Sequence, residues 1–170
     1  MKLRLELARD AGKVGCMDQR RHLRRLACVW ERRPVYLVTT CTAGRSRVLA
    51  SNEVHTILRD EWVSMRDRHG WMIGRYVVMP DHVHFFAAPV GHAAKPLAQA
   101  IAKWKEWTAR RSLRLLACEA PFWQPGFFDH LLRSAESRSA KWSYVRENPV
   151  RAGLVARTEA WPYAGSVDFE

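Results

Sequence analysis

The stretch from residue 71 to residue 88 constrains the fold more than any other part of the chain. Trp71 to Met79 is apolar at both alternating sets of positions, which is typical of a strand covered on both faces of a sheet. Pro80 and Asp81 supply turn chemistry, and an extended pattern resumes from His82 to Ala88. We therefore expect a hairpin in the middle of a sheet.

Sequence patterns typical of helices lie before and after this β-hairpin. Ser51 suits a helix N-cap, and apolar residues then recur every three or four positions up to Gly70, a residue type that often ends helices. Pro96 suits the first turn of a second helix. One face of that helix would carry Leu97, Ile101, Trp104 and Thr108.

Two more strands and a third helix complete the expected order. Strands are predicted over residues 35–42 and 123–132, and a helix from about Ser134 to Glu147, which ends before Pro149 because the residue preceding a proline resists the helical conformation. The rest of the chain is expected to form a short helical turn and then loop. This order predicts an α+β fold, ferredoxin-like or palm-like, with a mainly antiparallel sheet and helices packed on it.

The charge balance points to a polyanionic partner. The chain has 28 Lys and Arg against 17 Asp and Glu, a formal net charge of +11 at pH 7. Arginine supplies most of the surplus, and its guanidinium group both forks onto phosphate and stacks on bases, although high net charge can also serve solubility alone. The dense basic run over 20–33 is interpreted as a DNA-gripping arm or as a partly disordered leader. We therefore divide the chain into a basic N-terminal arm, 1–33, and one domain, 34–170.

Several classes of protein are disfavoured by what the sequence does not contain. No apolar stretch approaches the roughly 20 residues that span a bilayer, and no signal-peptide pattern opens the chain. No P-loop-like Gly-x-x-x-x-Gly-Lys sequence occurs, so no nucleotide cofactor is expected. The cysteines form no C-x-x-C pair, which argues against a zinc site or a disulfide framework; they are Cys16, Cys28, Cys41 and Cys118. We expect a cytoplasmic protein without a membrane partner.

His82 and His84 are the sharpest chemical feature. In a strand, residues two apart point to the same face with Cα atoms about 6.6 to 6.8 Å apart, so two imidazoles can converge on one cation. Val83 between them would point into the opposite, apolar layer. On spacing alone, ordinary surface or hydrogen-bonded histidines remain the commoner interpretation.

Tyr144 is a candidate nucleophile on the third expected helix, and Asn148 four residues later would lie on the same helical face. A phenol has a reference pKa of about 10, so it needs activation by a base, a cation or a hydrogen-bond network before it can attack. Without the histidines, a half-buried aromatic that anchors its helix would be the preferred interpretation.

Three motifs follow one another along the chain: GRYVVMPDHVH over 74–84, WQ and FFDH within 123–130, and YVRENPVRAGLV over 144–155. Together they resemble the HUH single-tyrosine transposases, and among them the REP-associated tyrosine transposases, which process short repeated palindromes in bacterial chromosomes. The resemblance covers roughly residues 33 to 165. It implies the α+β architecture of an HUH endonuclease.

The resemblance also implies a role for each matched position. His82 and His84 correspond to the two metal-binding histidines, Asn148 to the third ligand, and Tyr144 to the nucleophile that forms a 5′-phosphotyrosine on single-stranded DNA. The metal in such enzymes is Mg²⁺ or Mn²⁺, hard ions whose phosphate and water oxygens would complete the shell. Since the phosphotyrosine conserves the energy of the broken bond, strand transfer needs no ATP.

In this family, basic surfaces of the protein hold a DNA hairpin, and their contacts with its phosphates supply affinity and salt dependence. The candidate DNA-binding residues are Arg20, Arg21, Arg24, Arg25, Lys103, Lys105, Arg110 and Arg111. We expect a monomer, with a dimer as the alternative because related transposases exchange their tyrosine helices between subunits. Within the cell we expect association with the bacterial nucleoid.

The leading hypothesis is therefore a metal-dependent single-stranded DNA endonuclease and strand transferase, a transposase that recognises hairpin DNA resembling REP elements. The alternative is a catalytically silent hairpin-binding regulatory protein. A more distant alternative is a phosphohydrolase that uses His82 and His84 without covalent catalysis.

Overall fold

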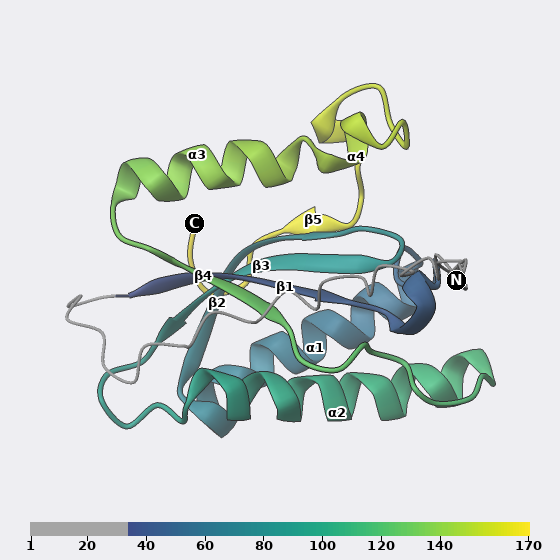
Figure 1. Cartoon of the computed structure of the whole chain (residues 1–170), viewed down its shortest axis with the longest axis horizontal. Coiled ribbons are helices and arrows are strands. Elements are labelled where there is room, and N and C mark those ends of the chain that lie inside the picture. The colour runs from purple at the N-terminus through teal and green to yellow at the C-terminus, as the bar shows by residue number, and fades with distance from the viewer. Residues whose placement is uncertain (1–33) are drawn as a thin grey trace, which may run out of the picture.

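The computed structural model describes residues 34–170, which form one antiparallel sheet between two layers of helices (Figure 1). The strands are β1 (Val35–Cys41), β2 (Trp71–Val78), β3 (His82–Pro89), β4 (Phe128–Leu132) and β5 (Ala164–Gly165). The helices are α1 (Asn52–His69), α2 (Leu97–Leu116), α3 (Ala135–Arg146) and α4 (Asn148–Arg151), with short 3₁₀ turns η1 (Ala43–Arg45) and η2 (Thr158–Ala160). The predicted α+β class and element order are confirmed, and the predicted arm over 1–33 lies outside the described residues.

The sheet has the order β4-β1-β3-β2-β5, with every neighbouring pair antiparallel. The predicted hairpin is the β2–β3 pair, and β3 lies in the centre of the sheet. Backbone bonds hold its turn on two sides. The amide of Thr42, just after β1, donates to the carbonyl of Asp81 (3.0 Å), and the amide of Leu49, between η1 and α1, donates to the carbonyl of Pro80 (2.9 Å). The start of β3 is therefore held in place from two directions.

Helices α1 and α2 cover one face of the sheet, which we call the α1/α2 face (Figure 1). The core on this side contains Val83 and Phe85 of β3. Trp62 of α1 stacks on Trp104 of α2, with ring centroids 5.5 Å apart and planes 6° from parallel. Such aromatic packing buries a large apolar area at one point, so the sheet and both helices are fixed together.

Helix α3 covers the opposite face, which we call the α3 face (Figure 1). Phe86 of β3 meets Trp142 of α3 edge to face at 6.2 Å, and Val145 packs with Val77. Because side chains alternate along a strand, Phe86 on the α3 face places His82 and His84 on that face as well. The sheet therefore separates the α1/α2 face, where the large core lies, from the face that carries the histidines.

The C-terminal segment adds the short fifth strand, which the sequence did not predict. The amide of Val78 donates to the carbonyl of Tyr163 (2.8 Å), and the indole of Trp161 donates to the carbonyl of Val78 (3.0 Å). Further on, the amide of Asp168 donates to the carbonyl of Ile73 (2.7 Å). The segment expected to be loop therefore extends the sheet beyond β2.

Gly70 provides a test of the local chemistry that ends α1. It adopts the left-handed conformation (φ 72°), and a Cβ there would lie 2.9 Å from the Cα of Ala94. We expect Gly70→Ala to lower the free energy of unfolding by about 1–3 kcal/mol, measured by chemical denaturation. Gly91→Ala is the matched control, since Gly91 has φ +68° but nothing within 4 Å of its Cβ position. Equal losses in the two variants would show that the contact with Ala94 has no effect.

Candidate active site

The two histidines at the start of β3 lie together on the α3 face, with ring centroids 4.8 Å apart and planes nearly perpendicular. Nδ1 of His82 donates to Oδ1 of Asp81 at 2.7 Å. Nδ1 of His84 lies 2.7 Å from the hydroxyl of Thr39, its neighbour on β1. Within residues 34–170, no hydrogen bond engages Nε2 of either ring, so both Nε2 atoms are left for another ligand.

The tautomer of His82 follows from its partner. A carboxylate can only accept a hydrogen bond, so the proton of a neutral His82 lies on Nδ1 and the lone pair on Nε2. Metal-ligating histidines are commonly held in this way, with the second nitrogen bonded to a carboxylate or another oxygen. Thr39 can hold His84 similarly by accepting from its Nδ1. The donor set therefore fits a divalent cation.

Burial keeps both imidazoles neutral. It lowers the pKa of His84 to about 3, and the positive charges of Arg45 and Arg151 act in the same direction. Burial also lowers the pKa of His82, and this effect outweighs the opposing contribution of Asp81. Neutral imidazole is the form that binds a metal, because protonation removes the donor lone pair.

Asp81 connects the histidine pair to the cation Arg45. The guanidinium of Arg45 lies 2.8 Å from Oδ2 of Asp81. Burial alone would raise the pKa of Asp81, but the hydrogen bond with His82 and the charge of Arg45 lower it overall. The carboxylate therefore remains charged while it holds the imidazole of His82 in position.

Tyr144 lies near the C-terminal end of α3 and is 62% exposed. The guanidinium carbon of Arg151 lies 3.9 Å from the centroid of its ring. Arg151 also donates to the backbone carbonyl of Tyr144 (2.8 Å) and to Oδ1 of Asn148. Because the charge of Arg151 also acts on His84, this one cation links the tyrosine helix with the histidine pair electrostatically.

α3 ends at Arg146, close to the predicted end before Pro149, and Asn148 begins the short helix α4, in whose first turn Pro149 lies. The side-chain oxygen of Asn148 accepts from Arg151, so ligation through that oxygen would require Arg151 to move away. Within residues 34–170, no group of three or more His, Cys, Asp or Glu side chains could hold a metal ion. The role of Asn148 as third ligand remains a prediction.

The predicted basic residues of α2 are not brought to the histidines, because α2 covers the α1/α2 face (Figure 1). Lys105 donates to the backbone carbonyls of Gln124 and Gly126. Arg111 pairs with Asp60 and Glu61. Lys103 pairs with Glu106, and the guanidinium of Arg110 lies over the ring of Trp107. DNA binding by these four residues remains a prediction, and Arg20, Arg21, Arg24 and Arg25 lie outside the described residues.

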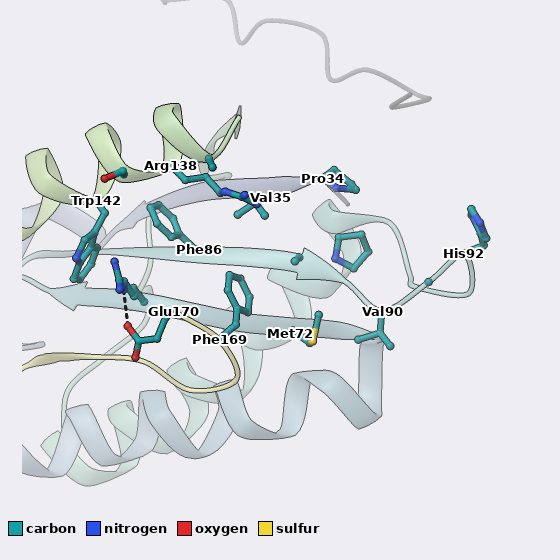
Figure 2. Close-up of a pocket in the computed structure, with 16 residues that line it drawn as sticks. Pro34, Val35, Met72, Phe86, Val90, His92, Arg138, Trp142, Phe169 and Glu170 are labelled. Carbon is teal, nitrogen blue, oxygen red and sulfur yellow. Dashed lines mark hydrogen bonds and ion pairs between the residues drawn. The ribbon is translucent and has the colours of Figure 1, made fainter. Parts of the chain in front are cut away.

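A cavity of about 860 Å³ opens on the α3 face. Phe86, Trp142 and Phe169 lie around it, and Glu170 bonds to Arg75 beside it (Figure 2). His82, His84 and Tyr144 do not line this cavity. It lies along the first part of α3, whereas the candidate active site lies at the other end of that helix.

Sequence reasoning missed four residues that surround the site, Thr39, Arg45, Asp81 and Arg151. The sequence indicates a turn at Asp81, and its position next to His82 is also the signal that a carboxylate could bond to that imidazole. Thr39 carries no such signal, because only the β1–β3 register places it opposite His84. Arg151 belongs to the motif over 144–155, but the sequence pattern assigns it no function.

Comparison with known proteins gives two related findings and one negative one. No family model matches the chain. A REP-associated tyrosine transposase of Escherichia coli (strain K12) is 24% identical over 121 residues, which is 71% of this chain and 68% of that protein. A solved structure of a REP-associated tyrosine transposase bound to a REP hairpin has a TM-score of 0.66, with 21% identity, over 84% of this chain and 81% of that one. The similarity confirms the predicted fold. Within residues 34–170, no helix is long and apolar enough to cross a membrane.

Proposed function

We propose that this chain, which is related to the REP-associated tyrosine transposases in sequence and in fold, cleaves and rejoins single-stranded DNA beside a hairpin. One observation carries the proposal. The α3 face presents two neutral histidines with free Nε2 atoms, and the tyrosine helix above that face presents an exposed phenol next to Arg151. This set of groups suits phosphodiester chemistry with a covalent intermediate.

In the proposed reaction, Oη of Tyr144 attacks the phosphorus and the bond from phosphorus to the 3′ oxygen breaks. The phenol gives up its proton, and the leaving oxygen takes up a proton to become a 3′-hydroxyl. The product is a 5′-phosphotyrosine, and attack by a 3′-hydroxyl reverses the step. No external energy source is needed, because one phosphodiester replaces another.

His82 and His84 would hold Mg²⁺ or Mn²⁺, with Asn148 as the proposed third ligand. When bound, such an ion neutralises charge on the phosphate oxygens and helps to align the phosphorus for in-line attack. Arg151 lies where its guanidinium could pair with the same phosphate, since it contacts Tyr144 and acts on His84. Asp81 and Thr39 would keep both Nε2 atoms directed at the ion.

The proposal is tested by incubating the protein with Mn²⁺ and a labelled hairpin oligonucleotide that carries a single-stranded flank. A covalent protein–DNA band that survives denaturing electrophoresis is the expected result. The alternative of a silent hairpin-binding protein predicts a shifted band in native gels and no covalent band across a set of hairpin sequences.

Asp81→Asn tests the positioning of His82. We expect the Mn²⁺ concentration for half-maximal adduct formation to rise about 10- to 100-fold, because a neutral amide can present either a donor or an acceptor to Nδ1 and no longer fixes the tautomer. The maximal rate at saturating Mn²⁺ should fall much less. Asp67→Asn is the matched control, since Asp67 is exposed on α1, away from the α3 face. An unchanged metal requirement in Asp81→Asn would show that Asp81 does not position the ligand.

A further inference from the structure

Phe128 is the most exposed large hydrophobic side chain within residues 34–170, with 63% of its surface accessible. It opens β4, which is an edge strand of the sheet. Its neighbour Phe127 is buried in the core between the sheet and the α1/α2 helices. Alternation along the strand accounts for one buried and one exposed ring, so what Phe128 contacts is decided by the surface on which it lies.

The strand register places Phe128 on the same face as the histidines. Phe128 pairs with Thr39 of β1, and Thr39 pairs with His84 of β3. Side chains directly opposite one another in antiparallel strands lie on the same side of the sheet, and the bond between Thr39 and His84 confirms the side. Since neighbouring strands are about 4.8 Å apart, Phe128 lies about 10 Å across the sheet from His84.

The segment that carries Phe128 is firmly held. Lys105 donates to the carbonyls of Gln124 and Gly126, and the amide of Gln124 donates to the carbonyl of Cys41 (2.9 Å). The indole of Trp123 donates to the hydroxyl of Thr108 at 2.9 Å. The backbone that leads into Phe128 is therefore held before any partner arrives, which reduces the entropy lost on binding.

The chemistry of this face favours an aromatic, anionic occupant. Arg45 and Arg151 supply positive charge around the histidines, while Phe128 and the exposed His130 supply rings two residues apart on β4. Bases of single-stranded nucleic acid stack on rings arranged in this way, with the backbone near cations. A purely apolar protein partner would make no use of the positive charge of Arg151, which no carboxylate within residues 34–170 neutralises in an ion pair.

We infer that Phe128 is a stacking platform for an unpaired base of the DNA strand whose phosphate lies at His82, His84 and Tyr144, with His130 beside it for the adjacent base. This inference rests on the proposed function and adds a binding subsite to it. Phe128 would hold the strand flat on the sheet and so set which phosphate reaches Tyr144.

The test uses the full chain and a hairpin oligonucleotide with a single-stranded flank that contains 2-aminopurine at one position at a time. In the wild type we expect stacking on the protein to quench the fluorescence of 2-aminopurine at one or two positions of the flank. Phe128→Ala should remove this quenching and weaken binding roughly 5- to 100-fold. Phe128→Trp should keep both, since it retains a ring at the same place.

Trp107→Ala is the matched control, because Trp107 is a 42% exposed aromatic on α2, outside the α3 face. It should leave the quenching pattern and affinity unchanged. If Phe128→Ala binds and quenches like the wild type, the subsite is refuted while adduct formation by the wild type still supports the proposed function. If the wild type neither binds the flanked hairpins nor forms adduct, both the function and the subsite are refuted.

Discussion

Replacing Tyr144 by Phe is expected to abolish the covalent protein–DNA adduct, with a loss of about 10³-fold or more in its rate of formation. The change removes only the hydroxyl group, which is the atom proposed to attack phosphorus. The ring of Tyr144 is exposed and contacts Arg151, and phenylalanine retains that face. Folding and hairpin affinity should therefore stay close to the wild type. Denaturing electrophoresis of reactions with a labelled hairpin measures the loss.

Tyr163→Phe provides the control for removing a hydroxyl elsewhere, and we expect it to form adduct normally. Adduct at the wild-type level in Tyr144→Phe would overturn the assignment of the nucleophile. Continued DNA cleavage without any adduct, in both the variant and the wild type, would instead favour the phosphohydrolase alternative. In that case the histidines would be correctly assigned and the tyrosine would be structural.

The elements that the sequence predicts well are those whose local signals agree with their packing. Ser51 caps α1 by accepting from the amide of Val54, and Gly70 ends the helix in the left-handed conformation. Ser134 caps α3 in the same manner, within a capping box. Buried faces repeat every three to four residues along α1 and α2, so tertiary packing reinforces what local spacing already favours.

The elements that the sequence misses depend on distant partners. Strand β5 has only two residues, and its pairing with Tyr76 and Val77 alone defines it. Strand β4 begins at Phe128 rather than at residue 123, because the preceding segment is bonded to α2 and to the end of β1 instead of pairing along a full strand. Neither β5 nor the start of β4 is marked in the sequence by hydrophobic periodicity or by a capping residue.

The same distinction holds at the site. Alternation along β3 predicts that His82 and His84 share a face and that Val83 points into the core, and the structure confirms both. Helical spacing from residue 144 to residue 148 does not predict that Arg151 bonds to the side-chain oxygen of Asn148. Contacts between charged side chains depend on where the chain turns, which the sequence pattern leaves open.

Replacing His84 by Gln is expected to reduce adduct formation at least about 100-fold at any Mn²⁺ concentration, a larger effect than the loss of a residue that only orients a ligand. The imidazole of His84 is partly buried and neutral, so it offers a lone pair that the glutamine amide does not match. Glutamine retains much of the side-chain volume and can still bond to Thr39, which limits the effect on folding. The rate of adduct formation over a series of Mn²⁺ concentrations measures the loss.

Chelation of divalent ions from the wild type should reproduce this loss, and re-addition of Mn²⁺ should reverse it only in the wild type. His92→Gln is the control, since His92 is exposed in the loop after β3 and belongs to neither the histidine pair nor the tyrosine helix. Hairpin affinity should change little in any of these cases, because contacts of cationic side chains with phosphates supply most of it. Full activity of His84→Gln, or of the chelated wild type, would contradict metal-dependent chemistry at the histidine pair and leave Arg45 and Arg151 as the charges available to the phosphate.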